Sequence, residues 1–167
     1  NDNEIIDFIN FTKDLPISVR FIEFMPFDGN KWDMSKMVSY AEVMKYVNEA
    51  FENENFERLQ DAPNDTAKNY KIKDYKGTFA IISSVTNPFC DSCNRLRLTA
   101  NGQLKNCLFS SGESDILTTL RAGKSIEPII RKAVQAKFKV RGGMDTLKKL
   151  KEPKLHNNNR SMITIGG

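Results

Sequence analysis

Three cysteines carry the most informative chemistry in this sequence, and all of them lie within one short stretch. They are Cys90, Cys93 and Cys107, spaced C-x2-C-x13-C. A two-residue gap in a tight turn brings two thiolates to one side, where they can bind a metal ion or an iron–sulfur cluster. Because three thiols cannot form a closed set of disulfides, the clustering predicts a metal site in a reducing compartment.

The fourth ligand of such a site is not obvious. A structural zinc ion needs four protein ligands, and the only histidine, His156, lies 49 residues beyond Cys107. Three thiolates around a four-iron cluster instead leave one iron open to a substrate atom. A thioredoxin-like pair of Cys90 and Cys93 is a further possibility, although no βαβ pattern surrounds it. The spacing favours the cluster and leaves zinc and thiol redox chemistry as alternatives.

Two arginines follow the cysteine pair at once. Arg95 and Arg97 lie two residues apart in a strand-like segment, so both side chains are expected on the same face. Two guanidinium groups on one face form a fork for phosphate or carboxylate. Beside the three thiols they predict an anion site, and the alternative is a pair of solvated arginines on an open sheet.

A β-hairpin must position these groups. Asn101-Gly102 lies between two alternating segments and is the strongest short signal for a hairpin, which folds Cys107 back towards the cysteine pair. Other strands are expected over 17–25, 70–73 and 78–85, the last two joined by a turn at Lys76-Gly77, whereas the polar segment 52–69 is expected to be a loop.

Helical periodicity supplies the remaining elements. It predicts helices over 5–11, 35–51, 114–121 and 126–139. In the second of these, Ser39 and Glu42 are spaced as a capping box. The polar tail from residue 141 onwards shows little periodicity. The fold class is therefore α+β, with an antiparallel element that carries the cysteines.

Glu23 is unusual because it lies within an apolar strand. A buried carboxylate is costly unless it has a partner. Arg20 is the nearest candidate, but strand alternation places residues 20 and 23 on opposite faces. Glu23 is expected either to form a buried pair or to face a cavity.

Composition sets wider limits. The chain has 167 residues, 40% of them hydrophobic and 28% charged, with a net charge of +4. No segment approaches the length of a membrane span, and NDNEIIDFIN does not resemble a signal peptide, so we expect a soluble, untargeted chain with no membrane partner. The spread of the lysines does not select a nucleic acid or any other anionic partner.

The segment FCDSCNRLRLTANGQLKNCLF, together with VRFIEFMPFDGNKWDMSKMVSY and the terminal IGG, closely resembles a known family. These are the GTP 3',8-cyclases, radical S-adenosylmethionine (SAM) enzymes of molybdenum cofactor (molybdopterin) biosynthesis. The resemblance covers about residues 17–167 and is to the C-terminal part of the family. The variant FDGNKW is more similar to eukaryotic members.

The resemblance implies roles for particular residues. Cys90, Cys93 and Cys107 would bind the second 4Fe-4S cluster, whose open iron binds GTP. Arg95, Leu96 and Arg97 would contact the nucleotide, with the arginines at its phosphates. Gly166 and Gly167 match the family's two terminal glycines, which enter the active site, where the absence of side chains allows close approach.

The resemblance also implies an architecture. Residues 1–26 would be the last helix and strand of an incomplete (β/α)6 barrel, and residues 27–167 would be the cluster- and GTP-binding domain. No C-x3-C-x2-C motif is present for the first 4Fe-4S cluster and SAM. The chain is therefore expected to be an inactive C-terminal fragment of a lyase.

The full-length family enzyme is expected to be a homodimer that forms 3',8-cyclo-7,8-dihydro-GTP. Its product would pass to cyclic pyranopterin monophosphate synthase. No nucleic-acid partner is implied. The location would be the mitochondrial matrix in a eukaryote or the cytoplasm in a bacterium. A zinc-stabilised structural or nucleic-acid-binding module is the alternative function.

Overall fold

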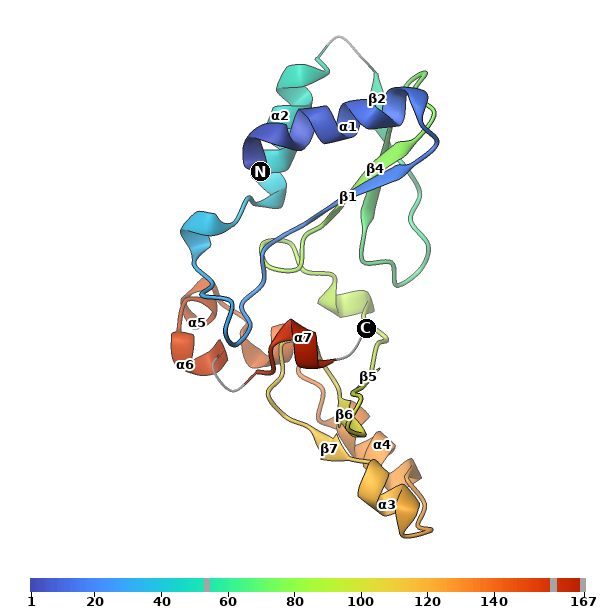
Figure 1. Ribbon diagram of the computed structural model, residues 1–167, viewed down its shortest axis with the longest axis vertical. Helices are drawn as coiled ribbons and strands as arrows, with labels where there is room; N and C mark the ends of the chain where they lie inside the picture. Colours follow the sequence, from blue (N-terminus) through green and yellow to red (C-terminus); the bar gives the residue numbers. More distant parts are fainter. Residues whose placement is uncertain (53–54, 157–158, 166–167) are drawn as a thin grey trace. The chain divides into compact units, whose positions relative to one another are not determined.

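The computed structural model describes residues 1–52, 55–156 and 159–165 (Figure 1). The chain divides into two compact units. The first comprises Asn1–Met25 and Ser35–Ser92, and the second comprises Pro26–Met34 and Cys93–Gly167. These units are defined by compactness, whereas the predicted division at residue 26 separates a family barrel from a cluster-binding domain. That division stays a prediction.

A four-stranded mixed sheet forms the centre of the first unit. Its strands lie in the order β1-β4-β3-β2. Their bounds are β1 Ser18–Ile22, β2 Phe56–Arg58, β3 Lys68–Ile72 and β4 Thr78–Ile82. Strand β1 pairs in parallel with β4, from Ser18 opposite Thr78 to Ile22 opposite Ile82, whereas the other pairs are antiparallel. β1 is therefore an edge strand of this sheet.

Two helices enclose the core of the first unit. They are α1, Ile5–Asp14, and α2, Tyr40–Ala50, and α1 crosses β1 and β4 (Figure 1). The buried side chains between helices and sheet are Ile5, Ile9, Val43, Val47, Phe51, Tyr70, Ile72, Tyr75, Phe79 and Ile81. The predicted capping box is confirmed, because Ser39 and Glu42 each bond the other's backbone N–H. Short 3₁₀ helices occupy η1 Asp2–Glu4, η2 Met34–Lys36 and η3 Cys90–Ser92.

The second unit is built on a three-stranded antiparallel sheet. Its strands are β5 Arg97–Leu98, β6 Gln103–Lys105 and β7 Ser114–Asp115, with β6 in the centre. Helices α3, Leu117–Arg121, and α4, Glu127–Gln135, follow. The small core consists of Leu104, Ile116 and Ala133, flanked by Ile126, Ile129 and Ile130. The remaining elements are η4 Arg141–Gly143, α5 Leu147–Leu150, α6 Pro153–His156 and α7 Met162–Ile165.

The predicted α+β class and the hairpin are confirmed, and so are most of the predicted helices. Two expectations were wrong. The polar segment 52–69 contains β2, which pairs with β3, and the predicted helix at residue 114 begins as strand β7. The tail, for which the pattern predicted no element, contains three short α-helices. In each case tertiary pairing or packing outweighs a weak local pattern.

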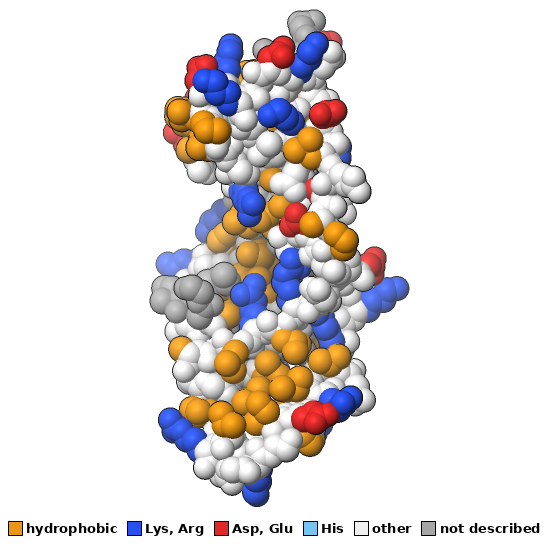
Figure 2. Space-filling view, turned by 90° about the vertical axis from the view of Figure 1, so that its right-hand side faces the viewer, with side chains coloured by type: hydrophobic (Ala, Val, Ile, Leu, Met, Phe, Trp, Pro, Cys, Tyr) orange, Lys and Arg blue, Asp and Glu red, His pale blue; other side chains and the backbone are white. Residues whose placement is uncertain are grey.

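Surface properties agree with the mixed composition. Figure 2 shows lysine and arginine side chains scattered among apolar and uncharged groups on the face that it presents, without a single basic block. In the described part of the chain, no helix has the length and apolar character needed to cross a membrane.

Glu23 follows β1 and is almost fully buried, with 3% of its surface exposed. Its carboxylate accepts backbone N–H groups from Val85 at 2.6 Å, Thr86 at 2.8 Å and Tyr40 at 2.9 Å, and also accepts the Thr86 hydroxyl. It therefore bonds the first residue of α2 and the loop after β4. Arg20 is not among these partners; three backbone N–H groups and a hydroxyl satisfy the carboxylate.

Replacing Glu23 by Ala should lower the free energy of unfolding by about 3 kcal/mol, because several part-buried N–H groups would lose their acceptor. Urea denaturation of the purified protein, followed by circular dichroism, measures the change. Glu57→Ala, at an exposed position of β2, is the matched control and should stay within about 0.5 kcal/mol. Equal stabilities for Glu23→Ala and wild type would show that the carboxylate does not hold this region.

Candidate functional site

The turn of the hairpin fixes the register of the cysteine-bearing stretch. Gly102 has φ +77°, in the left-handed region that favours glycine, and a Cβ there would lie 2.3 Å from Cβ of Leu117. The buried Thr99 hydroxyl accepts the backbone N–H of Gln103 at 2.9 Å. Arg97 is consequently opposite Lys105, and Leu98 is opposite Leu104. Cys107 follows two residues after the end of β6.

All three cysteines are half-buried thiols. Cys90 begins η3, Cys93 follows that helix directly, and Cys107 follows β6. Cys90 belongs to the first unit, and the other two belong to the second. The three thus lie at the ends of regular elements, which is where ligands to a bound group can be presented.

The predicted convergence of the three thiols, which come from both units, stays a prediction. Among the residues that the structure describes, no three His, Cys, Asp or Glu side chains lie close enough to hold a metal ion. Thiolates repel one another, and it is the binding of the metal that normally supplies the free energy to draw them together. The assignment of Cys90, Cys93 and Cys107 as ligands stays a prediction.

Cys93 lies in a polar environment. The Lys137 ammonium donates to its Sγ at 3.4 Å and to its carbonyl oxygen at 3.0 Å. Burial raises the pKa of the Cys93 thiol, but hydrogen bonds from the Arg95 backbone, Lys137 and the Arg95 side chain outweigh it, so the pKa is lowered. These donors favour the thiolate, which is the form that binds metals.

The two arginines differ in how they are held. Arg97 is the first residue of β5, whereas Arg95 precedes the strand, so the expected strand over both is shorter than predicted. Both are half-buried, while Leu96 and Leu98 are 38% and 65% exposed. Such alternation is typical of an extended segment. Leu96 is thereby accessible to a ligand.

A buried ion network anchors the segment after Cys107. The Lys105 side chain is completely buried and donates to the Ser110 carbonyl and to Oδ1 of Asn159 at 3.1 Å. Its Nζ lies 3.6 Å from Oε1 of Glu113. Arg160 donates to both oxygens of Glu113, at 2.5 and 2.6 Å. The hydrogen bonds to Arg160 lower the pKa of Glu113, and burial lowers the pKa of Lys105 despite the attraction of Glu113.

Sequence reasoning missed Lys105, Glu113, Lys137 and Arg160. Lysine, glutamate and arginine side chains are mostly exposed in proteins, so the residue type alone does not predict that these four are buried or half-buried. The one available hint was the register of the hairpin, which places Lys105 on the central strand.

The remaining candidate residues are His156 and the two terminal glycines. His156 is buried, and its ring packs edge-on against Trp32 with centroids 5.5 Å apart. Its Nε2 has no hydrogen-bond partner among the described residues. Gly166 and Gly167 lie outside the described residues.

Comparison with known proteins identifies the family. Residues 17–142 match the model of the family "Molybdenum Cofactor Synthesis C", a range that includes every cysteine and both arginines. The chain belongs to this family. This finding confirms the resemblance inferred from the cysteine stretch and does not favour a zinc-stabilised or nucleic-acid-binding module.

Individual relatives agree with the family assignment. The chain is 46% identical over 170 residues to the mitochondrial GTP 3',8-cyclase of Arabidopsis thaliana, covering 100% of this chain and 41% of the relative. It is 42% identical over 169 residues to molybdenum cofactor biosynthesis protein 1 of Mus musculus, covering 99% and 25%. The GTP 3',8-cyclase of Listeria monocytogenes is 40% identical over 140 residues, covering 82% and 41%. The chain therefore spans less than half the length of these relatives.

The Glu113 network should make stability depend on pH. Because its folded-state pKa is lowered, Glu113 stabilises the protein above its ordinary pKa of 4.5, and the effect is lost as pH falls through the folded value. At about pH 7, Glu113→Gln should lower the free energy of unfolding by about 1 to 3 kcal/mol. Urea midpoints measured from pH 7 down to about pH 3 should converge for wild type and variant.

The exposed pair Glu127–Arg131 supplies the matched control. Glu127→Gln should change stability by less than about 1 kcal/mol at every pH. A Glu113→Gln deficit that stays constant to about pH 3 would mean that the ionised carboxylate is not the stabilising species.

Proposed function

We propose that this chain is the substrate-binding C-terminal part of a GTP 3',8-cyclase. In this proposal Cys90, Cys93 and Cys107 bind the second 4Fe-4S cluster, and GTP binds beside it. The observation that carries the proposal is the family match over residues 17–142, which spans all of these positions. The relatives named GTP 3',8-cyclase support the same substrate.

The donor set suits a cluster held by thiolates. All three cysteines are thiols, and Cys93 is surrounded by N–H donors that stabilise its thiolate. A cluster with three protein ligands supplies an open iron that binds a substrate atom. Three cysteines in 167 residues match that number of ligands.

The arginines would bind the triphosphate. Pairing of β5 with β6 fixes the backbone at Arg97, and the carbonyl of Arg95 is bonded by Lys137. Guanidinium groups with fixed backbones can bind phosphate oxygens in pairs at little entropic cost. Leu96, between them and exposed, would contact the nucleotide through its apolar side chain.

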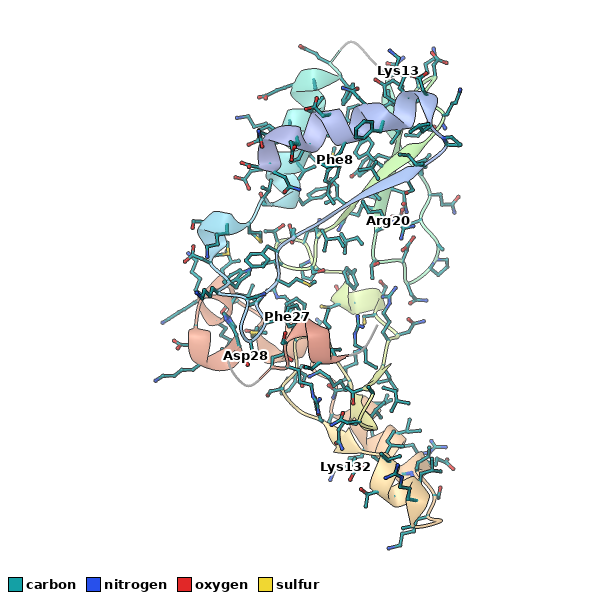
Figure 3. The ribbon with its side chains drawn as sticks, in the orientation of Figure 1. Phe8, Lys13, Arg20, Phe27, Asp28 and Lys132 are labelled. Atoms are coloured by element: carbon teal, nitrogen blue, oxygen red, sulfur yellow. The ribbon has the colours of Figure 1, made fainter. Side chains whose placement is uncertain are left out.

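The edge position of β1 supports the proposed barrel. In the four-stranded sheet, β1 pairs with β4 along one of its edges, and its other edge has no partner strand among the described residues. Ile22, at the end of β1, is 59% exposed. On α1, Phe8 (labelled in Figure 3) and Phe11 are 37% and 54% exposed. These features suit residues 1–26 as the last helix and strand of a truncated (β/α)6 barrel whose earlier strands continue the sheet. Residues 27–167 would then form the cluster- and GTP-binding domain.

The complete reaction needs parts that this sequence does not contain. SAM and the first 4Fe-4S cluster would be held by the preceding part of the protein, and the fragment alone would be inactive. When bound there, SAM and the first cluster would supply the radical that starts the joining of the ribose C3' to C8 of guanine. The role of this chain is to hold GTP in the geometry for that step, with Gly166 and Gly167 entering the site.

The cellular context follows the same proposal. The mitochondrial matrix is the proposed location, by analogy with the mitochondrial relative in Arabidopsis thaliana. The full-length protein would act as a homodimer and pass its product to cyclic pyranopterin monophosphate synthase.

Ligand substitution tests the cluster. In the full-length protein, Cys93→Ala should reduce bound iron and sulfide by about half, because one of two clusters loses a ligand. Ser92→Ala, a neighbouring exposed position, is the control and should retain the wild-type content. Metal analysis after anaerobic reconstitution measures both. Stoichiometric zinc in the wild type, with no iron lost in Cys93→Ala, would contradict the proposal.

Arginine substitution tests GTP binding separately. Arg95→Ala and Arg97→Ala should each weaken GTP binding roughly tenfold to a hundredfold, the loss expected for charged hydrogen bonds to phosphate. Isothermal titration of the reconstituted full-length protein gives the dissociation constants. Arg121→Ala, on the exposed surface of α3, should bind as wild type does. If guanosine binding falls as much as GTP binding, the arginines do not act on the phosphates.

A further inference from the structure

Lys137 makes an unusual set of contacts beside the cysteine pair. Its Nζ donates to the carbonyl oxygens of Cys93 and Arg95, at 3.0 and 3.1 Å, and to Sγ of Cys93 at 3.4 Å. An ammonium group has three N–H donors, so these contacts use all of them. One side chain thus bonds a predicted cluster ligand and the predicted phosphate-binding residue that follows.

The position of this ammonium does not depend on the thiol alone. Two of its three acceptors are backbone carbonyls, so its place is fixed even when the sulfur is bonded to something else. Lys137 lies two residues after the end of α4, and that helix is anchored in the core through Ala133. The lysine therefore reaches the thiol from a rigid support.

The same end of α4 also contacts the third cysteine's neighbour. The Asn106 side-chain amide donates to the Ala133 carbonyl at 2.9 Å. Asn106 directly precedes Cys107 in the chain. The C-terminal turn of α4 thus accepts a bond from the side chain of the residue before Cys107, and Lys137, two residues after that helix, bonds Cys93.

We propose that Lys137 is a positioning residue that holds Cys93 and Arg95 in a fixed relation and raises the reduction potential of the cluster bound by Cys90, Cys93 and Cys107. This inference rests on the proposed function. An N–H donor and a positive charge at a ligand sulfur stabilise the state with the extra electron. In a titration that electron comes from the added reductant.

Removing the charge should therefore lower the potential. Lys137→Met in the full-length protein should reduce the ratio of reduced to oxidised second cluster at a fixed potential by about tenfold, which is about 59 mV for a one-electron couple. Lys137→Arg should restore most of the wild-type value because it retains both charge and donors. A redox titration followed by electron paramagnetic resonance measures the potential, with the first cluster's cysteines replaced so that one signal remains.

Lys132→Met is the matched control. Lys132 lies on α4, is exposed, and is labelled in Figure 3. Its loss removes the same charge from a position five residues away in the chain, and it should leave the potential unchanged. A fall of equal size in both variants would overturn the inference, because it would reflect net charge instead of the contact with Cys93.

Further outcomes separate this inference from the proposed function. An iron–sulfur signal in wild type and Lys137→Met with equal potentials would overturn the role of Lys137 and leave the cluster assignment intact. If Lys137→Met loses its iron, the same titration on Lys137→Gln decides, because glutamine retains N–H donors without the charge, and an unchanged potential overturns the inference. A wild-type protein that binds zinc and no cluster would overturn both proposals.

Discussion

The geometry of the second unit depends on one completely buried ammonium group, that of Lys105. A buried charge is costly unless hydrogen bonds and an opposite charge surround it. Ser110, Asn159 and Glu113 meet that need; the first and last follow Cys107 closely, and Asn159 comes from the C-terminal tail. Any movement of these segments would leave the buried ammonium group without its partners, so Lys105 constrains how they fold together.

Charged side chains play a comparable part near the other cysteines. In the first unit, Glu23 holds Val85 and Thr86, a few residues before Cys90. In the second, Lys137 holds the backbone from Cys93 to Arg95. Each cysteine thus follows or precedes a segment that a charged side chain fixes through backbone groups. Apolar packing gives little directional control, whereas a charge that needs several donors or acceptors selects one arrangement of the chain around it.

The sequence predicted what local chemistry determines. The hairpin depends on Asn101-Gly102, and the start of α2 depends on the spacing of Ser39 and Glu42, so both could be predicted. Strand β2 could not, because its partner β3 begins ten residues later and two of its own three residues are charged. Lys105 and Lys137 could not be predicted either, since their partners include backbone carbonyls and, for Lys105, residues distant in sequence, whose positions only the folded chain defines.

Arg95 and Arg97 also differ in whether a local sequence signal or a distant contact places the backbone. The backbone of Arg97 is placed by strand pairing with Lys105, which the hairpin signal encodes locally. Arg95 lies outside the strand, and its carbonyl is held by a lysine 42 residues away in sequence. An anion fork built from this pair would therefore have one arm set by the hairpin and the other by α4. Because Lys137 bonds both Cys93 and Arg95, the sulfur and the second arm of the fork would shift together if α4 moved.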